Sequence, residues 1–231
     1  MAKSKIIKQF ARGEIDTEIA LRQLKVLLAE LPDKNNLAWV NKELQGYDKN
    51  DVIPLYRKAV GTLKGSIMNY GTHVSNIGIP LSSDAPKNLR RFCNSVIFYD
   101  SIGALKRLTV KQDGNGCFGV VVPPDYYPSI MKYSLTSMTA ILNAQVVVGK
   151  SDIFQIFSEV DNKVLDVLMF LEQEFGVLDD LDINLDLKTE DDIKSIQNQI
   201  NFYIYNDNRV TIGDENEISD SVISVDSEIK Q

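Results

Sequence analysis

The side chains that could do chemistry in this chain are few. His73 is the only histidine among 231 residues, which excludes a site of several histidines and leaves one candidate general base. Cys93 and Cys117 lack the paired spacing of a zinc site, and we expect both to be reduced and buried. No phosphate-binding loop of the form Gly-x-x-x-x-Gly-Lys-Ser/Thr occurs. These observations predict no catalytic residue and no cofactor, and an undetected hydrolase stays an alternative.

Acidic residues gather after position 178 and could hold a metal ion. Four side chains alternate there as in a calcium-binding loop, although leucine stands where that loop needs glycine: Asp180, Asp182, Asn184 and Asp186, with Leu185. The runs 179–180 and 190–192 are dense enough for magnesium, but nuclease sites normally add a lysine or histidine from a packed core. We interpret the stretch as a solvated acidic linker and predict no metal site.

Basic residues cluster at one expected helix. Lys87, Arg90 and Arg91 could line one side of it, and aromatic residues follow at Phe98 and Tyr99. Clustered cations are enough to contact phosphates, so this face is a candidate nucleic-acid contact. A solvated basic face is the alternative that we favour.

The most unusual combination of residues lies in one segment after the second expected helix. It consists of Trp39, Glu43, Gly46, Tyr47, Pro54, Tyr56 and Arg57. The pattern indicates a helix ended by glycine in a left-handed conformation, a short loop, and a strand entered after proline. We expect Glu43 and Arg57 to form a charge-assisted pair between helix and strand. A structural staple is the favoured interpretation, and a binding surface or a catalytic site made by the same residues are the alternatives.

Apolar spacing predicts the elements that must position these residues. Helices are expected over 4–11, from Asp16 or Thr17 to Leu31, and from Asp33 to Gln45, the last two forming an antiparallel hairpin. Strands are expected over 56–63, 66–72, 74–79, 117–122 and 135–148. We favour helix over 94–107, although 96–99 also suits a strand. A long helix over 151–175 ends at Gly176 and could brace the domain.

The fold class predicted is therefore α+β, with the N-terminal helical hairpin packed on a mostly antiparallel sheet. We place a domain over 1–177 and an acidic linker and tail over 178–231. From Asp179 onward there are 14 acidic and 4 basic residues, which leaves 18 and 21 before it, so a net charge of −10 follows a body of +3. A short helix is expected over 193–200, then either a disordered tail or short strands over 209–218 that could mediate self-association.

The segment from Trp39 to Tyr47, followed by Pro54-Leu55-Tyr56-Arg57, resembles the AbiTii domain family. The leucine-rich helix before it and the helix 153–174 are similar as well, so the resemblance covers roughly 1–177. It implies a role in bacterial abortive infection against phages. It carries over no catalytic residue.

The sequence thus favours a non-enzymatic binding or assembly protein of a defence system. The expected partners are a second copy through the tail and another protein of the system. The alternative is a nucleic-acid binder gated by the acidic tail. No apolar run approaches the roughly 20 residues of a spanning helix, and no apolar segment follows the basic N-terminus, so we expect a cytoplasmic protein without membrane association.

Overall fold

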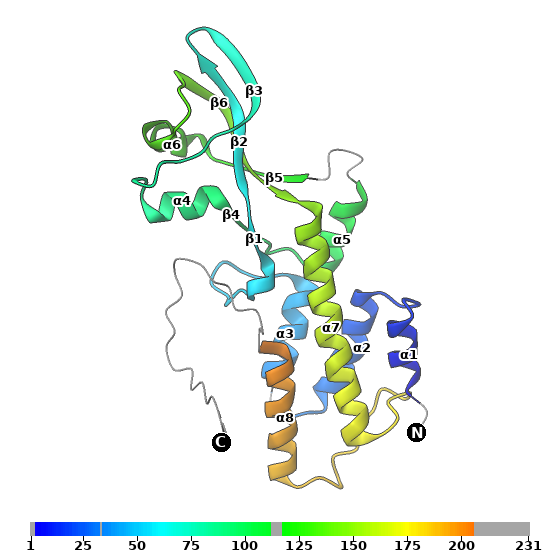
Figure 1. Cartoon of the computed structure of the whole chain (residues 1–231). Coiled ribbons are helices and arrows are strands. Elements are labelled where there is room, and N and C mark those ends of the chain that lie inside the picture. The colour runs from blue at the N-terminus through cyan, green and yellow to red at the C-terminus, as the bar shows by residue number, and fades with distance from the viewer. Residues whose placement is uncertain (1–2, 33, 112–116, 206–231) are drawn as a thin grey trace, which may run out of the picture.

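The computed structural model describes residues 3–32, 34–111 and 117–205. Helices α1, α2, α3 and α8 gather at one end of an elongated molecule, the sheets lie with α4 and α6 at the other, and the long helix α7 runs between the two ends (Figure 1). This arrangement confirms the predicted α+β class. In chain order the elements are α1 (Lys5–Ala11), α2 (Thr17–Ala29), α3 (Asn35–Gln45), the 3-10 turn η1 (Leu55–Arg57), β1 (Lys58–Val60), β2 (Thr62–Asn69), β3 (Thr72–Gly78), α4 (Lys87–Asn94), β4 (Ser95–Ile97), α5 (Ile102–Lys111), β5 (Cys117–Val121), η2 (Pro124–Tyr126), α6 (Tyr127–Tyr133), β6 (Ala140–Gly149), α7 (Lys150–Phe175) and α8 (Glu190–Tyr205).

The long helix α7 is the axis on which the other helices pack. Its 26 residues make it about 39 Å long at 1.5 Å per residue. One apolar stripe of α7 is buried, from Ile153 to Leu171, and α1, α2, α5 and α8 all contact it. The predicted capping of α2 is confirmed, because Asp16 accepts a hydrogen bond of 2.9 Å from the amide of Ile19.

Two antiparallel sheets share one continuous ribbon of chain, residues 58–69. Its first part, the short strand β1, pairs with β4. Its longer second part, β2, is an inner strand of a four-stranded sheet of order β3-β2-β6-β5. The change of sheet occurs at Gly61, where an added Cβ would lie 2.4 Å from Cγ1 of Val146. Among the strands that the structure describes, β4 and β5 are both edge strands beside this point.

The structure corrects two sequence assignments around the ribbon. Residues 55–57 form a tight 3-10 turn rather than the start of a strand, because Tyr56 and Arg57 must both reach α3. In the segment 94–107, which was predicted as one helix, Asn94 ends α4, residues 95–97 form strand β4, and helix α5 begins only at Ile102. Pairing with β1, as in the 2.9 Å bond from the amide of Phe98 to the carbonyl of Arg57, outweighs local helical preference.

The chain after α7 continues into the same core. Leu178, Ile183, Ile196 and Ile200 are buried, and α8 is longer than the predicted helix 193–200. The N-terminus is fixed nearby, since the hydroxyl of Ser4 donates to Glu172 at 2.6 Å and accepts from the amide of Leu178 at 2.9 Å. The division at residue 177 stays a prediction.

Two expectations fall outside the described residues: the start of the third helix at Asp33 and the short strands over 209–218. None of the described helices is both long enough and apolar enough to cross a membrane.

Gly65 and Gly78, two glycines of the four-stranded sheet, differ in how much space surrounds them. A Cβ on Gly65 would lie 2.3 Å from the carbonyl oxygen of Asn143, whereas a Cβ on Gly78 would meet nothing within 4 Å. We expect Gly65→Ala to lower the free energy of unfolding by about 1–3 kcal/mol, as overpacking does. Gly78→Ala should be close to neutral. Chemical denaturation followed by circular dichroism measures both, and equal midpoints would contradict this packing.

Candidate functional site

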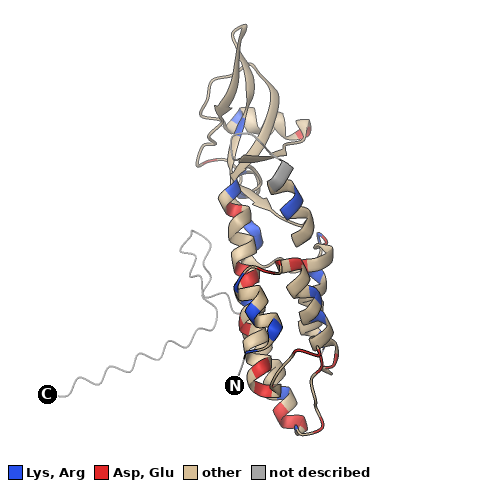
Figure 2. Ribbon diagram, turned by 90° about the vertical axis from the view of Figure 1, so that its right-hand side faces the viewer, with Lys and Arg blue, Asp and Glu red and all other residues tan. Residues whose placement is uncertain are grey.

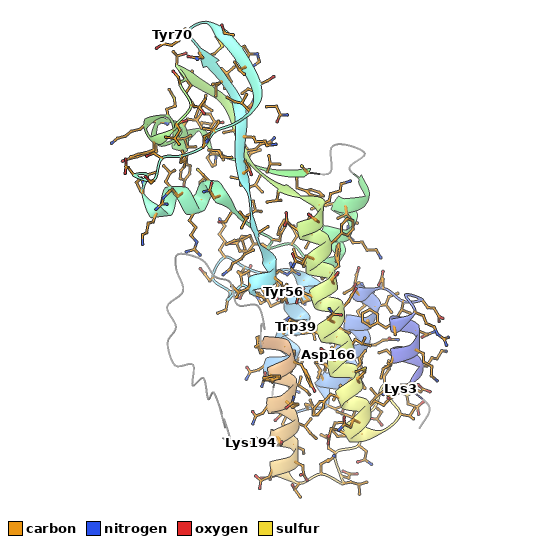
Figure 3. All side chains as sticks on the ribbon, in the orientation of Figure 1. Lys3, Trp39, Tyr56, Tyr70, Asp166 and Lys194 are labelled. Carbon is orange, nitrogen blue, oxygen red and sulfur yellow. The ribbon has the colours of Figure 1, made fainter. Side chains whose placement is uncertain are left out.

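Five of the singled-out side chains meet in one buried cluster, which we call the clamp: Trp39, Glu43, Tyr47, Tyr56 and Arg57. The carboxylate of Glu43 pairs with the guanidinium of Arg57, and both side chains are fully buried. The predicted ion pair is therefore present. Figure 3 shows Trp39 and Tyr56 beside α7, between the helical end and the sheets.

The hydrogen bonds of the clamp are centred on Glu43. Its Oε1 accepts from the hydroxyls of Tyr47 and Tyr56, each at 2.7 Å, while Oε2 accepts from Arg57. The hydroxyl of Tyr56 in turn accepts from the indole of Trp39 at 2.9 Å. Arg57 also donates to the carbonyls of Phe98 and Asp100. The clamp thus ties α3 to η1 and to the segment that joins β4 to α5.

Local backbone geometry brings these side chains together. Trp39 and Glu43 are four residues apart and share a face of α3. Gly46 ends the helix at φ 99° and ψ 170°, a positive-φ region that favours glycine, although not the left-handed helical ψ that was expected. A Cβ there would lie 2.9 Å from the carbonyl of Tyr99, which accepts a bond of 2.7 Å from the amide of Tyr47. Pro54 precedes η1 as its N-cap.

Burial keeps the two tyrosines of the clamp protonated. Burial, then the negative charge of Glu43, raises the pKa of Tyr47 far above its usual value, and the same two causes raise that of Tyr56. Both phenols remain donors at neutral pH, so neither can serve as a base there. The closed geometry favours the structural staple over a reactive site.

Lys163 belongs beside the clamp and was missed in the sequence because it stands in a helical apolar pattern. Its ammonium donates to the carbonyl of Ile204 at 2.9 Å and to that of Tyr203 at 3.3 Å. It also lies 5.8 Å from the centre of the Tyr56 ring. A cation here satisfies carbonyls at the end of α8 and attaches that end to the clamp.

An open cavity of about 580 Å³, which we call the α4–β5 groove, is lined by residues of α4, β4 and β5. Of the predicted basic cluster, Lys87 and Arg91 line it, whereas Arg90 turns away and donates to the carbonyl of Ala85 at 3.2 Å. Leu89 and Cys93 are buried on the other side of α4. The rest of the lining is mostly apolar: Asn88, Phe92, Ser95, Val96, Ile97, Tyr99, Val120, Val121, Val122 and Val146.

Charge and aromatic surface meet at the rim of the groove. Within the described part of the chain, neither Lys87 nor Arg91 forms an ion pair with a carboxylate. Phe92 stacks on Tyr126 with 4.3 Å between ring centroids and 14° between planes, and both rings are partly exposed. The valine run before Pro123-Pro124 was the sequence signal for the opposite wall, but only the fold shows that it faces α4.

Other candidate residues are not brought together. His73 lies exposed on β3, and among the described residues no three His, Cys, Asp or Glu side chains are placed to hold a metal ion. Acidic residues gather on the loop before α8 (Figure 2). Burial raises the pKa of the Cys93 thiol to about 11. Cys117 is exposed at the start of an edge strand, so the expectation that both thiols are buried was wrong for it.

A polar hollow of about 510 Å³ borders the clamp, with Gly46 and Tyr47 in its lining. Lys42 also lines the hollow and pairs with Asp51 at 2.6 Å, so a carboxylate of the same region already neutralises its charge. The α4–β5 groove combines apolar walls with two cations that pair with no carboxylate of the described residues, and it is therefore the stronger candidate for binding.

Removing one partner of the clamp leaves the other charged and buried. We expect Glu43→Gln to cost about 3 kcal/mol or more of unfolding free energy, because Arg57 loses its counter-charge. Adding Arg57→Met should recover part of that loss. Arg22→Gln, which breaks the exposed Arg22–Glu18 pair on α2, is the control and should cost about 0.2–0.5 kcal/mol. Denaturant titration of all four chains measures these differences, and equal stabilities of Glu43→Gln and the control would refute a buried pair.

Comparison with known proteins gives one match. No curated protein and no solved structure matches the chain. The family model AbiTii matches residues 4–199, which include the clamp, the groove and most of α8. Since the match spans well over half of the chain, this protein belongs to the AbiTii family.

Proposed function

We propose that this protein is a non-enzymatic binding component of bacterial abortive infection, and that the α4–β5 groove takes up an extended segment of a partner protein. AbiTii membership indicates the anti-phage context. The observation that carries the binding role is that β4 and β5 each have one edge that pairs with no other described strand, and that both strands line one apolar groove.

The direction of the main-chain groups supports strand addition. The amide of Val122 donates to the carbonyl of Ala144 in β6 at 2.9 Å. Because the main-chain groups of successive residues point to opposite sides of a strand, those of Gly119 and Val121 point away from β6. In the β1–β4 pair, the amide of Phe98 donates to the carbonyl of Arg57, and the amide of Gly61 donates to the carbonyl of Asn94. By the same rule, the main-chain groups of Ile97 point away from β1. An added strand gains affinity from such groups and specificity from the side-chain pockets beside them.

The charge at the rim favours a particular class of segment. Lys87 and Arg91 stand four residues apart on α4, exposed above the valines of β5. A partner strand with β-branched residues and nearby carboxylates would match the walls and the rim together. Because exposed charges act mainly on association rate and partner choice, most of the affinity would come from the strand and its apolar side chains.

Nucleic-acid binding is the second candidate, and one observation favours it. The stacked Phe92 and Tyr126 rings lie beside the two basic residues, an arrangement in which single-stranded nucleic acid stacks bases and contacts phosphates. Tyr126 is not among the residues that line the groove, and the groove itself is mostly apolar, which favours protein.

Reversing the rim charge tests the proposed function. In a host where the unmodified chain lowers plaque counts, Lys87→Glu with Arg91→Glu should restore plaques by at least tenfold. The control is Lys8→Glu with Lys194→Glu, which makes the same change in net charge at exposed helical positions and should protect fully. Equal protection by both double variants, at equal protein levels, would show that the groove has no part in defence.

Purified protein separates the two candidates. Fluorescence anisotropy with a 20-nucleotide oligothymidylate at low salt should give weak binding that the groove variant and the control share. Tight binding that Lys87→Glu with Arg91→Glu abolishes, and that weakens steeply with added salt, would instead establish a nucleic-acid surface.

A further inference from the structure

We infer that the chain's own C-terminal segment, residues 218–229, occupies the α4–β5 groove until a partner protein displaces it. The inference rests on the proposed function, since it gives the same groove an internal competitor. It would make the protein self-inhibited, with partner binding coupled to release of the segment.

The apolar and acidic residues of the segment match the apolar walls and the basic rim of the groove. It reads Ile-Ser-Asp-Ser-Val-Ile-Ser-Val-Asp-Ser-Glu-Ile, without proline or glycine, and its centre carries the β-branched residues Val222, Ile223 and Val225. In an extended conformation Ile223 and Val225 would share one face. No lysine or arginine occurs between positions 210 and 229, where six acidic residues lie. The segment is thus an acidic strand former opposite a basic rim.

The groove offers complementary groups in the same small space. The main-chain groups of Val121 and Ile97, two residues of the lining, point away from their paired strands, and valine side chains line the walls. The two cations at the rim have no carboxylate partner within residues 3–32, 34–111 and 117–205. Asp220, Asp226 and Glu228 would flank the apolar centre and could supply those partners.

The point from which the segment departs is close to the groove. Lys163 holds the carbonyl of Ile204, at the end of α8, beside the ring of Tyr56. Arg57, which follows Tyr56 in the chain, leads into β1, and the three residues of β1 span about 10 Å. Strand β1 pairs with β4, which forms one wall of the groove. The twelve residues 206–217 can extend to about 40 Å, which is longer than these steps taken together. A short tether of this kind gives an effective concentration on the order of millimolar, so modest affinity is enough for occupancy.

A spin label on the segment tests the contact in the full-length chain. The label is attached at Ser224→Cys in a Cys117→Ser background, where Cys93 is buried with its thiol pKa raised to about 11 and stays unlabelled. The amide signals of Ile97 and Val121 should broaden, whereas that of Ile6 on α1 should not. Adding Val222→Asp with Ile223→Asp should abolish the broadening. Absence of broadening at the groove, or broadening that persists in the double variant, would overturn the inference.

Mixed samples identify which copy supplies the segment. Spin-labelled chains without isotope are combined with isotope-labelled chains that carry no spin label. The inference expects no broadening in this mixture, and broadening there equal to that within one chain would assign the groove to a second copy instead.

A competition experiment gives an independent measure. A fluorescein-labelled synthetic peptide of residues 218–229 should bind the Val222→Asp, Ile223→Asp chain at least tenfold more tightly than the unmodified chain, because the internal competitor is gone. Lys87→Glu with Arg91→Glu should remove this binding. No peptide binding by any of these chains would refute self-occupancy of the groove, whereas the proposed function fails separately, on the plaque counts.

Discussion

The fold depends on keeping a carboxylate and a guanidinium together away from water. Taking each charge out of solvent costs several kcal/mol, so Glu43 and Arg57 are tolerated only when all their partners are in place. Those partners come from α3, from η1 and from the segment after β4. The clamp therefore fixes where α3 ends and where the ribbon 58–69 begins, and with it the position of both sheets.

The α4–β5 groove follows from that constraint. Once η1 is held at α3, the ribbon pairs first with β4 and, after Gly61, with β6, and the two outer strands are left facing one space. Open strand edges invite unwanted pairing, and proteins commonly guard them with charged residues. Lys87 and Arg91 stand at this place, so the same cations can discourage most strands and admit acidic ones.

Local patterns predicted much of this fold, and long-range pairing accounts for what they missed. The helices around Leu24 and Val164 were predictable because apolar residues that recur every 3.6 positions lie on one face of a helix, and that face is buried here. The Glu43–Arg57 pair was predictable because opposite charges flank a glycine-ended helix and a proline. Strand β4 was missed, since Val96 pairs only because η1 delivers β1 to it. The groove could not be foreseen, because its walls come from α4, β4 and β5, and only the tertiary fold places them together.

The attachment of Ser4 to Glu172 has a consequence for how this protein is made. The first helix is fixed by groups 168 residues later in the chain, and the α2–α3 hairpin finds its buried surface on α7, which follows the sheets. During synthesis the early helices therefore cannot complete their core until α7 has left the ribosome. Contacts over such separations form slowly, so the surface that α7 later covers stays exposed on the nascent chain until then.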